Sequence, residues 1–262
     1  MTRIDKVMAA RKAAGKKAIF IYITAGAPDV RTTIEAVKRA EAAGADVIEL
    51  GLPFSDPMAD GPVIQTASVV ALKNGMTLAK ELDLVREIRK FSDIPLIGMG
   101  YINNMYHYGF EKFVEDFKAA GMDGVIIPDV PHEESGDLRR IAAAHDFVLA
   151  EFITPGTTAV RMEEICQDAS GFIYCVSNNG VTGVKKVDYS TIGAVCDTAR
   201  NYTRTPLAVG FGIGSPEAAV AAAAHADAVI VGSAVVKELL AGKLDEAAQL
   251  IADIREALDK SY

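Results

Sequence analysis

The chain has 262 residues, of which 50% are hydrophobic and 24% are charged, and its formal net charge at pH 7 is −8. This composition excludes a disordered or fibrous chain, and the length allows a core as large as that of an α/β barrel. The negative charge and the lack of clustered cations argue against a nucleic-acid partner.

The cysteines and the apolar runs indicate where the protein works. Cys166, Cys175 and Cys196 form no C-x-x-C pair, so neither a zinc site nor a disulfide framework is expected. Residues 1–15 lack the apolar core and cleavage site of a signal peptide, and no apolar run is long enough to cross a membrane. We therefore expect a cytoplasmic protein.

Apolar runs and helical patterns alternate along the chain. The apolar residues 7–10 stand among basic residues, which predicts a leading helix that ends at Gly15. Residues 18–23 are continuously apolar, as a parallel strand covered on both faces requires. The other expected strands are 47–51, 95–100, 124–127, 148–153, 171–176, 207–209 and 228–231, and helices are expected at about 29–43, 63–73, 78–90, 110–120 and 134–145, and after each of the last three strands.

This alternation predicts the fold class. Eight apolar runs at a spacing of roughly thirty residues match a (β/α)8 barrel better than an open sheet. We predict one α/β domain over residues 1–262, a single TIM barrel with an extra N-terminal helix and an extra helical segment after the second strand. A doubly wound sheet is the alternative, but it more typically places its glycine-rich phosphate loop after the first strand.

Two carboxylates lie where the second strand meets a loop that contains several prolines. Glu49 points away from the more apolar strand face, and Asp60 lies in the loop. Functional groups of TIM barrels come from this end of the strands. Burial is expected to raise the pKa of Glu49, which makes it a candidate proton shuttle, while Asp60 binds a developing cation or an N–H group. An ion-paired structural acid and an ordinary turn residue are the alternative interpretations.

Glycine-rich turns follow the last three expected strands. They occupy residues 177–183 and 210–214 and the pair Gly232-Ser233. Glycine lets backbone N–H groups approach an anion, and a helix N-terminus adds unpaired donors. Because barrel phosphate sites frequently use the loops after strands seven and eight, these turns predict a phosphate site.

The residues around the predicted barrel mouth favour proton transfer to a flat substrate. Four rings lie at or just beyond strand ends, which suggests a pocket for an apolar ring, although they could simply fill the barrel. These rings are Tyr22, Tyr101, Tyr174 and Phe211. No metal-ligand spacing is present, and no predicted strand carries a Schiff-base lysine. Arg139 and Arg140 are interpreted as a solvated helix face, and the four histidines as ordinary loop or helix residues.

Several segments together carry a resemblance to a known family. Residues 49–65, ELGLPFSDPMADGPVIQ, are similar to the signature segment of the tryptophan synthase alpha subunit. The resemblance extends to residues 22–26, 128–134, 180–183, 210–213 and 232–234, in order along nearly the whole chain. It supports the barrel and implies an activity.

The implied reaction is the retro-aldol cleavage of indole-3-glycerol phosphate to indole and glyceraldehyde 3-phosphate, in the last steps of tryptophan biosynthesis. Glu49 matches the general acid/base of the family, and Asp60 matches the residue that holds the indole N–H. The remaining matches are Tyr22, Tyr101, Tyr174 and Phe211 in the indole pocket, Gly183, Gly212, Gly232 and Ser233 in the phosphate cradle, and Thr182 in a loop that closes near Asp60.

The resemblance also implies a partner. Family members need no cofactor in this chain and pair with a pyridoxal-phosphate-dependent beta subunit in an α2β2 heterotetramer, and the loop that holds Pro53 and Asp56 resembles part of that interface. Asn178 stands where the family usually has arginine, which predicts altered loop closure. Two alternatives remain: a stand-alone indole-releasing lyase, and a catalytically silent phosphate-binding regulatory barrel.

Overall fold

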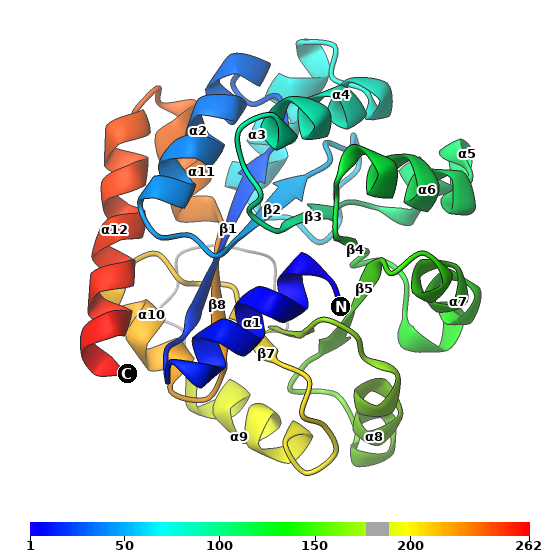
Figure 1. Ribbon diagram of the computed structural model, residues 1–262, viewed down its shortest axis with the longest axis vertical. Helices are drawn as coiled ribbons and strands as arrows, with labels where there is room; N and C mark the ends of the chain where they lie inside the picture. The colour runs from blue at the N-terminus through cyan, green and yellow to red at the C-terminus, as the bar shows by residue number, and fades with distance from the viewer. Residues whose placement is uncertain (177–188) are drawn as a thin grey trace.

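The computed structural model describes residues 1–176 and 189–262. Within them, eight parallel strands pair in chain order, and β1 pairs with both β2 and β8 to close a barrel (Figure 1). The strands are β1 (Ala18–Thr24), β2 (Val47–Gly51), β3 (Leu96–Met99), β4 (Gly124–Ile126), β5 (Val148–Ile153), β6 (Ile173–Val176), β7 (Leu207–Gly210) and β8 (Ala228–Val231). The predicted TIM barrel is confirmed.

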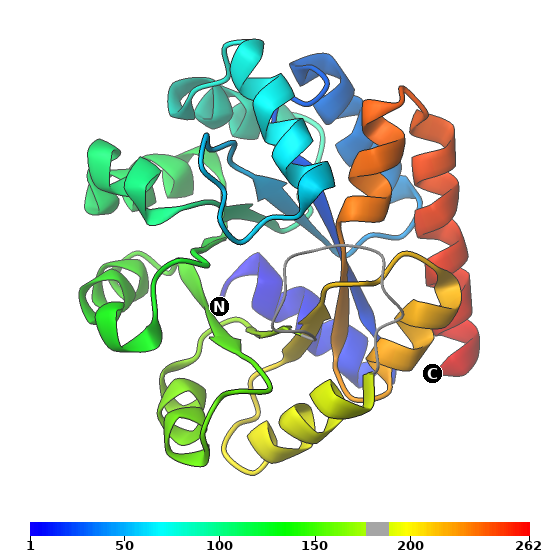
Figure 2. The same cartoon turned by 180° about the vertical axis from the view of Figure 1, so that it is seen from behind.

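Helices surround the strands (Figures 1 and 2). They are α1 (Arg3–Ala13), α2 (Val30–Ala42), α3 (Pro62–Lys73), α4 (Leu78–Arg89), α5 (Ile102–Tyr108), α6 (Phe110–Ala120), the 3-10 turn η1 (His132–Glu134), α7 (Gly136–Ala144), α8 (Ala159–Asp168), α9 (Tyr189–Ala199), α10 (Pro216–Ala223), α11 (Ser233–Leu240) and α12 (Leu244–Ser261). The leading helix and the additional helical segment after the second strand are both present, as α1 and as the pair α3 and α4.

The predicted element boundaries differ from the structure where local backbone geometry overrides hydrophobicity. Strand β6 begins at Ile173, not at residue 171, because Gly171 has a φ of +67°, outside the strand region. Helix α5 was not predicted, since seven residues are too few to show a helical period. Gly109, with a φ of +88°, separates it from α6.

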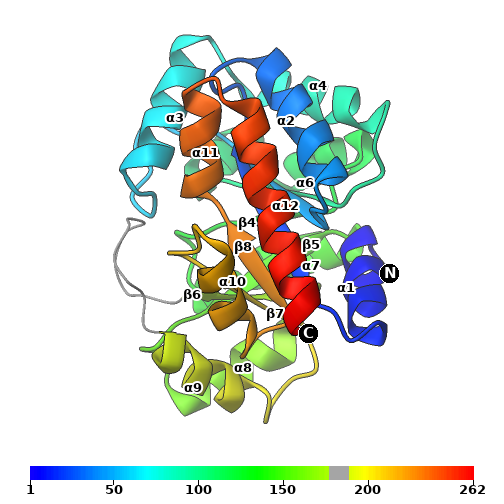
Figure 3. The same cartoon turned by 90° about the vertical axis from the view of Figure 1, so that its left-hand side faces the viewer.

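Helix α1 covers the amino-terminal end of the barrel. It crosses the barrel in Figure 1, lies behind it in Figure 2 and lies at one end in the side view of Figure 3. Its Ile4 and Met8 are buried in the cluster that fills the barrel interior, which includes Phe20 and Phe172 with ring centroids 5.0 Å apart. Helix α1 therefore closes the barrel interior at this end.

Ion pairs connect the helices to this closed end. The carboxylate of Asp46 lies 2.6 Å from Arg11 Nε on α1 and 3.4 Å from Arg255 Nη1 on α12. The same carboxylate also contacts the first strand, because its Oδ2 accepts a hydrogen bond from the backbone N–H of Ile19 on β1 at 2.9 Å. The terminal helices are thus attached to the first strand, and the charge of Asp46 is paired.

Candidate active site

Two buried acids meet at the carboxyl end of β2. Glu49 lies on the strand between Tyr22 of β1 and Ile97 of β3 in the sheet register, and only 2% of its surface is exposed. Asp60 lies in the loop that leads into α3 and is 7% exposed. The negative charge of Asp60 acts on Glu49, which places the two carboxyl groups in one site.

The environment gives the two acids different pKa values. Burial, reinforced by the charge of Asp60, raises the pKa of Glu49 to about 8. Its Oε2 has no hydrogen-bond partner among the described residues. Burial raises the pKa of Asp60 to about 6, against a hydrogen bond from Tyr101 that favours the ionised form. Near pH 7 the site therefore holds a protonated Glu49 beside an ionised Asp60, which provides one proton donor and one negative charge.

Tyr101 positions the loop that carries Asp60. This tyrosine is 2% exposed and directly precedes α5. Its hydroxyl accepts the backbone N–H of Ala59 at 3.0 Å and donates to the Asp60 carboxylate. Its ring stacks on Phe54, with the centroids 5.2 Å apart. Both ends of the loop are thus attached to one side chain.

Both acids line a cavity of about 60 Å³ at the barrel mouth. Most of the residues proposed from the sequence share it, namely Tyr22, Tyr174, Phe211, Gly212, Gly232 and Ser233. Tyr101 is not among the lining residues. The volume is well below the roughly 300–1,000 Å³ of ordinary ligand sites, so a substrate would extend beyond it.

Four aliphatic lining residues were not singled out from the sequence. They are Ile64, Met99, Ile213 and Ile230. Met99 and Ile230 lie in β3 and β8, where an apolar residue matches the strand pattern whether it faces the lumen or the helices. Counting the inward-facing strand positions across the sheet from Glu49 could have identified Met99 and Ile230.

Small residues create the space for the two tyrosine rings. A methyl group built on Gly51 would lie 2.0 Å from the Tyr22 hydroxyl oxygen, and one built on Gly210 would lie 2.2 Å from that of Tyr174. Both distances are far shorter than a van der Waals contact. Each ring therefore lies across a strand glycine, and this arrangement directs the ring into the cavity.

The other side of the cavity is formed by backbone suited to an anion. Gly232 precedes α11 and Ser233 begins it, and Gly232, the N-cap residue, has no side chain that could cap the helix. Phe211 and Gly212 both have positive φ angles, +79° and +75°. Backbone N–H groups at a helix N-terminus are a feature of phosphate sites.

The remaining proposed residues lie elsewhere. Thr182 and Gly183 fall outside the described residues, as does Asn178. Pro53 is buried, and its carbonyl oxygen accepts from Asn104 Nδ2 at 3.4 Å. Asp56 is exposed on the same loop. The structure thus separates these two loop residues from the cavity.

The interpretation of Arg139 as a solvated residue was wrong. Its Nη1 donates to the backbone oxygen of His132 at 2.8 Å and lies 3.4 Å from the Glu151 carboxylate. His132 and Glu151 are buried and lie 3.1 Å apart beside a second cavity of about 270 Å³. Arg140 is exposed, as expected. The paired charges of this network stabilise the β4–β5 region.

The comparisons with known proteins agree over nearly the whole chain. The family described as "Tryptophan synthase alpha chain" matches residues 8–261. The tryptophan synthase alpha chain of Caldanaerobacter subterraneus is 41% identical over 263 residues, covering 98% of this chain and all of the relative.

Solved structures show the same similarity in three dimensions. Tryptophan synthase subunit alpha from Legionella pneumophila is 37% identical with a TM-score of 0.92, covering 99% of both chains. A chain of Mycobacterium tuberculosis tryptophan synthase is 29% identical with a TM-score of 0.91, covering 98% of both chains. The chain belongs to the tryptophan synthase alpha chain family.

Proposed function

We propose that this chain, a lyase by its family, cleaves indole-3-glycerol phosphate to indole and glyceraldehyde 3-phosphate with Glu49 and Asp60 as its catalytic residues. The observation that carries the proposal is the pair of acids in one cavity, with the pKa of Glu49 raised to about 8 and that of Asp60 to about 6. General acid–base chemistry requires this separation.

Each acid has one part of the reaction. Glu49 gives its proton to the indole ring carbon that bears the side chain, and Asp60 stabilises the positive charge at the ring N–H. The bond between that carbon and the glycerol chain then breaks, while the adjacent hydroxyl loses its proton to Glu49 and becomes the aldehyde. One proton enters and one leaves, so the ionised Glu49 formed in the first step is reprotonated in the second.

The cavity orients the substrate. Tyr22, Tyr174 and Phe211 contact the indole ring, and Tyr101 acts through Asp60. Gly212, Gly232 and Ser233 bind the phosphate with backbone N–H groups. We also assign Gly183 to the phosphate cradle and Thr182 to the closing loop.

The proposed chemistry consists of proton transfers and the cleavage of one carbon–carbon bond, and we assign no cofactor to this chain. Pyridoxal phosphate belongs to the beta subunit, the partner that the family name implies. We propose an α2β2 complex in which the loop with Pro53 and Asp56 contacts this partner. Met58 of the same loop and Tyr106 of α5 are 75% and 79% exposed, which suits a contact surface.

We place the complex in the cytoplasm. The three cysteines are buried free thiols, and such thiols are typical of a reducing compartment. Among the described residues, no helix is both long enough and apolar enough to cross a membrane.

Indole release by the purified chain tests the assignment of the acids. We expect Glu49→Gln to lower kcat by about 10²–10⁴-fold, because the amide keeps the shape and loses the transferable proton. Asp60→Asn should be similarly impaired with substrate binding largely retained. Near wild-type turnover by Glu49→Gln would exclude this mechanism, whereas a wild-type chain that releases no indole, alone or with the beta subunit, would favour a silent regulatory barrel.

The partner assignment needs its own measurement. We expect added beta subunit to raise the rate of indole release, and Asp56→Ala to weaken that effect while leaving the rate of the isolated chain unchanged. Strong activity that does not respond to the beta subunit would identify a stand-alone lyase.

A further inference from the structure

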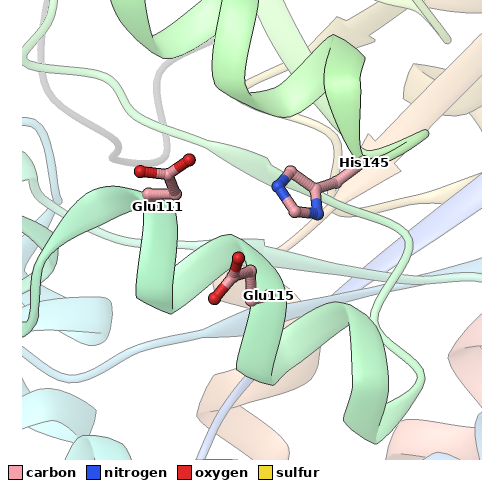
Figure 4. A group of neighbouring side chains, drawn as sticks. All are labelled: Glu111, Glu115 and His145. Carbon is pink, nitrogen blue, oxygen red and sulfur yellow. The ribbon is translucent and has the colours of Figure 1, made fainter.

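Three potential metal ligands converge on the outer surface of the barrel, away from the active site. Glu111 and Glu115 lie one turn apart on α6, and His145 is the residue that ends α7 (Figure 4). One ligand atom from each lies within 4.8 Å of the others. We propose that these three side chains form a binding site for a divalent transition-metal ion, with zinc as the ion that fits best.

The ligand set determines the class of ion. Residues four apart share a helix face, so Glu111 and Glu115 present their oxygens to the same point. Two carboxylates and one imidazole suit zinc, whose bonds to such oxygens and nitrogens are about 2.0–2.2 Å long and which accepts three protein ligands with water completing the shell. Ligand atoms on one zinc ion therefore lie up to about 4 Å apart. The separations here, within 4.8 Å, are close to this limit, so the three side chains have to draw together when the ion binds.

The local charges favour a bound cation. Two glutamates four residues apart on a helix repel each other. The nearby lysines are otherwise engaged: Lys112 Nζ lies 2.6 Å from an Asp116 oxygen, and Lys118 Nζ lies 2.7 Å from a backbone carbonyl. Among the described residues, no hydrogen bond or ion pair satisfies either glutamate side chain or the imidazole of His145. A bound cation would remove the repulsion between the glutamates.

The helix backbones that carry the ligands are fixed. Phe113 and Phe117 anchor α6 in the core, with ring centroids 4.3 Å apart. The carbonyl that receives Lys118 belongs to Asp146, the residue after His145, so this bond connects the two helix ends. Asp146 has a φ of +50° and turns the chain sharply after α7. The ligands are thus presented by rigid elements, which lowers the entropy cost of binding.

The site makes a prediction about stability that is independent of catalysis. An ion bound by α6 and α7 connects two neighbouring outer helices, and a ligand that binds only the folded state stabilises it by mass action. None of the three residues lines the catalytic cavity. Metal-free protein should therefore retain its activity and unfold at a lower temperature than zinc-loaded protein.

Calorimetric titration of the chelator-treated full chain with zinc chloride tests the proposal. We expect one zinc ion per chain in wild type, and an affinity at least tenfold weaker in His145→Ala and in the double variant Glu111→Gln/Glu115→Gln. His225→Ala, which removes another half-buried histidine, and Glu163→Gln/Glu164→Gln, which removes two other exposed charges, should bind zinc as wild type does.

A second readout separates ligand loss from misfolding. Cobalt bound at the site should show visible absorption that changes in His145→Ala, while circular dichroism confirms the helix content of each variant. His145→Asn serves if the alanine variant does not fold. Absence of zinc binding by wild type, or wild-type affinity in a folded variant that lacks the ligands, would overturn the proposal.

Discussion

At the scale of single residues, the pKa values of the two proposed catalytic acids predict the pH dependence of the proposed reaction. In the proposed active form, Glu49 is protonated and Asp60 is ionised. The proton on Glu49 is lost as the pH rises through about 8, and the negative charge on Asp60 is lost as the pH falls through about 6. We expect kcat/KM for indole release to be highest between these values and to fall on both sides.

The apparent pKa values of the rising and falling limbs of this profile describe Glu49 and Asp60 together, because the charge of Asp60 contributes to the raised pKa of Glu49. Rates measured from pH 5 to 10, with protein stability checked at each pH, give the profile. A rate that still rises above pH 9 would contradict a protonated Glu49 as the active form.

A further buried acid, Glu81, allows the cost of burial to be measured outside the active site. Glu81 on α4 is 2% exposed, its Oε2 has no partner among the described residues, and burial raises its pKa from 4.5 to about 8. Between these pH values the folded state binds more protons than the unfolded state, so its contribution to the free energy of unfolding falls as the pH rises.

We therefore expect Glu81→Gln to match wild type in stability below pH 4.5 and to exceed it progressively up to about pH 8. The gain should be a few kcal/mol, since one pKa unit corresponds to about 1.4 kcal/mol. Urea unfolding at several pH values measures it, with Glu87→Gln on the exposed face of α4 as the control. An equal difference at every pH would show that this carboxyl does not titrate as proposed.

At the scale of secondary-structure elements, the strand glycines determine the shape of the site. Replacing Gly210 of β7 by alanine would place a methyl group 2.2 Å from the Tyr174 hydroxyl oxygen, and the ring has to move. Tyr174 packs against Phe152 and Phe211, with ring centroids 5.2 Å and 6.1 Å away, so its displacement disturbs the cavity wall.

We expect Gly210→Ala to lower kcat/KM by at least about tenfold and to reduce stability by about 1–3 kcal/mol. Gly136→Ala is the matched control, because a methyl group built at Gly136 of α7 has no atom within 4 Å. Steady-state kinetics and urea unfolding of both variants decide the question. Wild-type kinetics in Gly210→Ala would show that the position of Tyr174 does not matter for the reaction.

At the scale of the whole molecule, the proposed catalytic acids and the proposed phosphate site lie at the ends of the two strands that flank β1. The acids come from β2 and its loop, whereas Gly232 and Ser233 follow β8. We expect removal of the phosphate from the substrate to weaken binding by about a hundredfold or more, because charge-assisted contacts with backbone N–H groups are lost.

A negative charge introduced at Ser233 tests where the phosphate of the substrate lies. Ser233→Glu should weaken binding of the phosphorylated substrate by like-charge repulsion and leave binding of the dephosphorylated analogue unchanged. Inhibition constants for the two ligands, measured on both proteins, provide the comparison. Equal effects on the two ligands would place the phosphate elsewhere.

The sequence determined the architecture and the end of the barrel at which function resides. Continuous apolar runs predict buried parallel strands, and Glu49 at the end of such a run predicts an acid at the barrel mouth, since both depend on local pattern. The family resemblance assigned roles to these residues. Gly171 and the short α5 show the limit of such patterns, because backbone angle and length there override hydrophobicity.

Only the tertiary structure decided which side chains meet. The hydrogen bond from Tyr101 to Asp60, the pairing of Arg139 with Glu151, and the convergence of Glu111 and His145 all join residues in different elements. Their separations depend on barrel closure and on how the outer helices pack, which no local period encodes. The sequence predicted a raised pKa for Glu49 because its strand is apolar. That its Oε2 has no hydrogen-bond partner among the described residues depends on which groups surround it, and only the structure showed this.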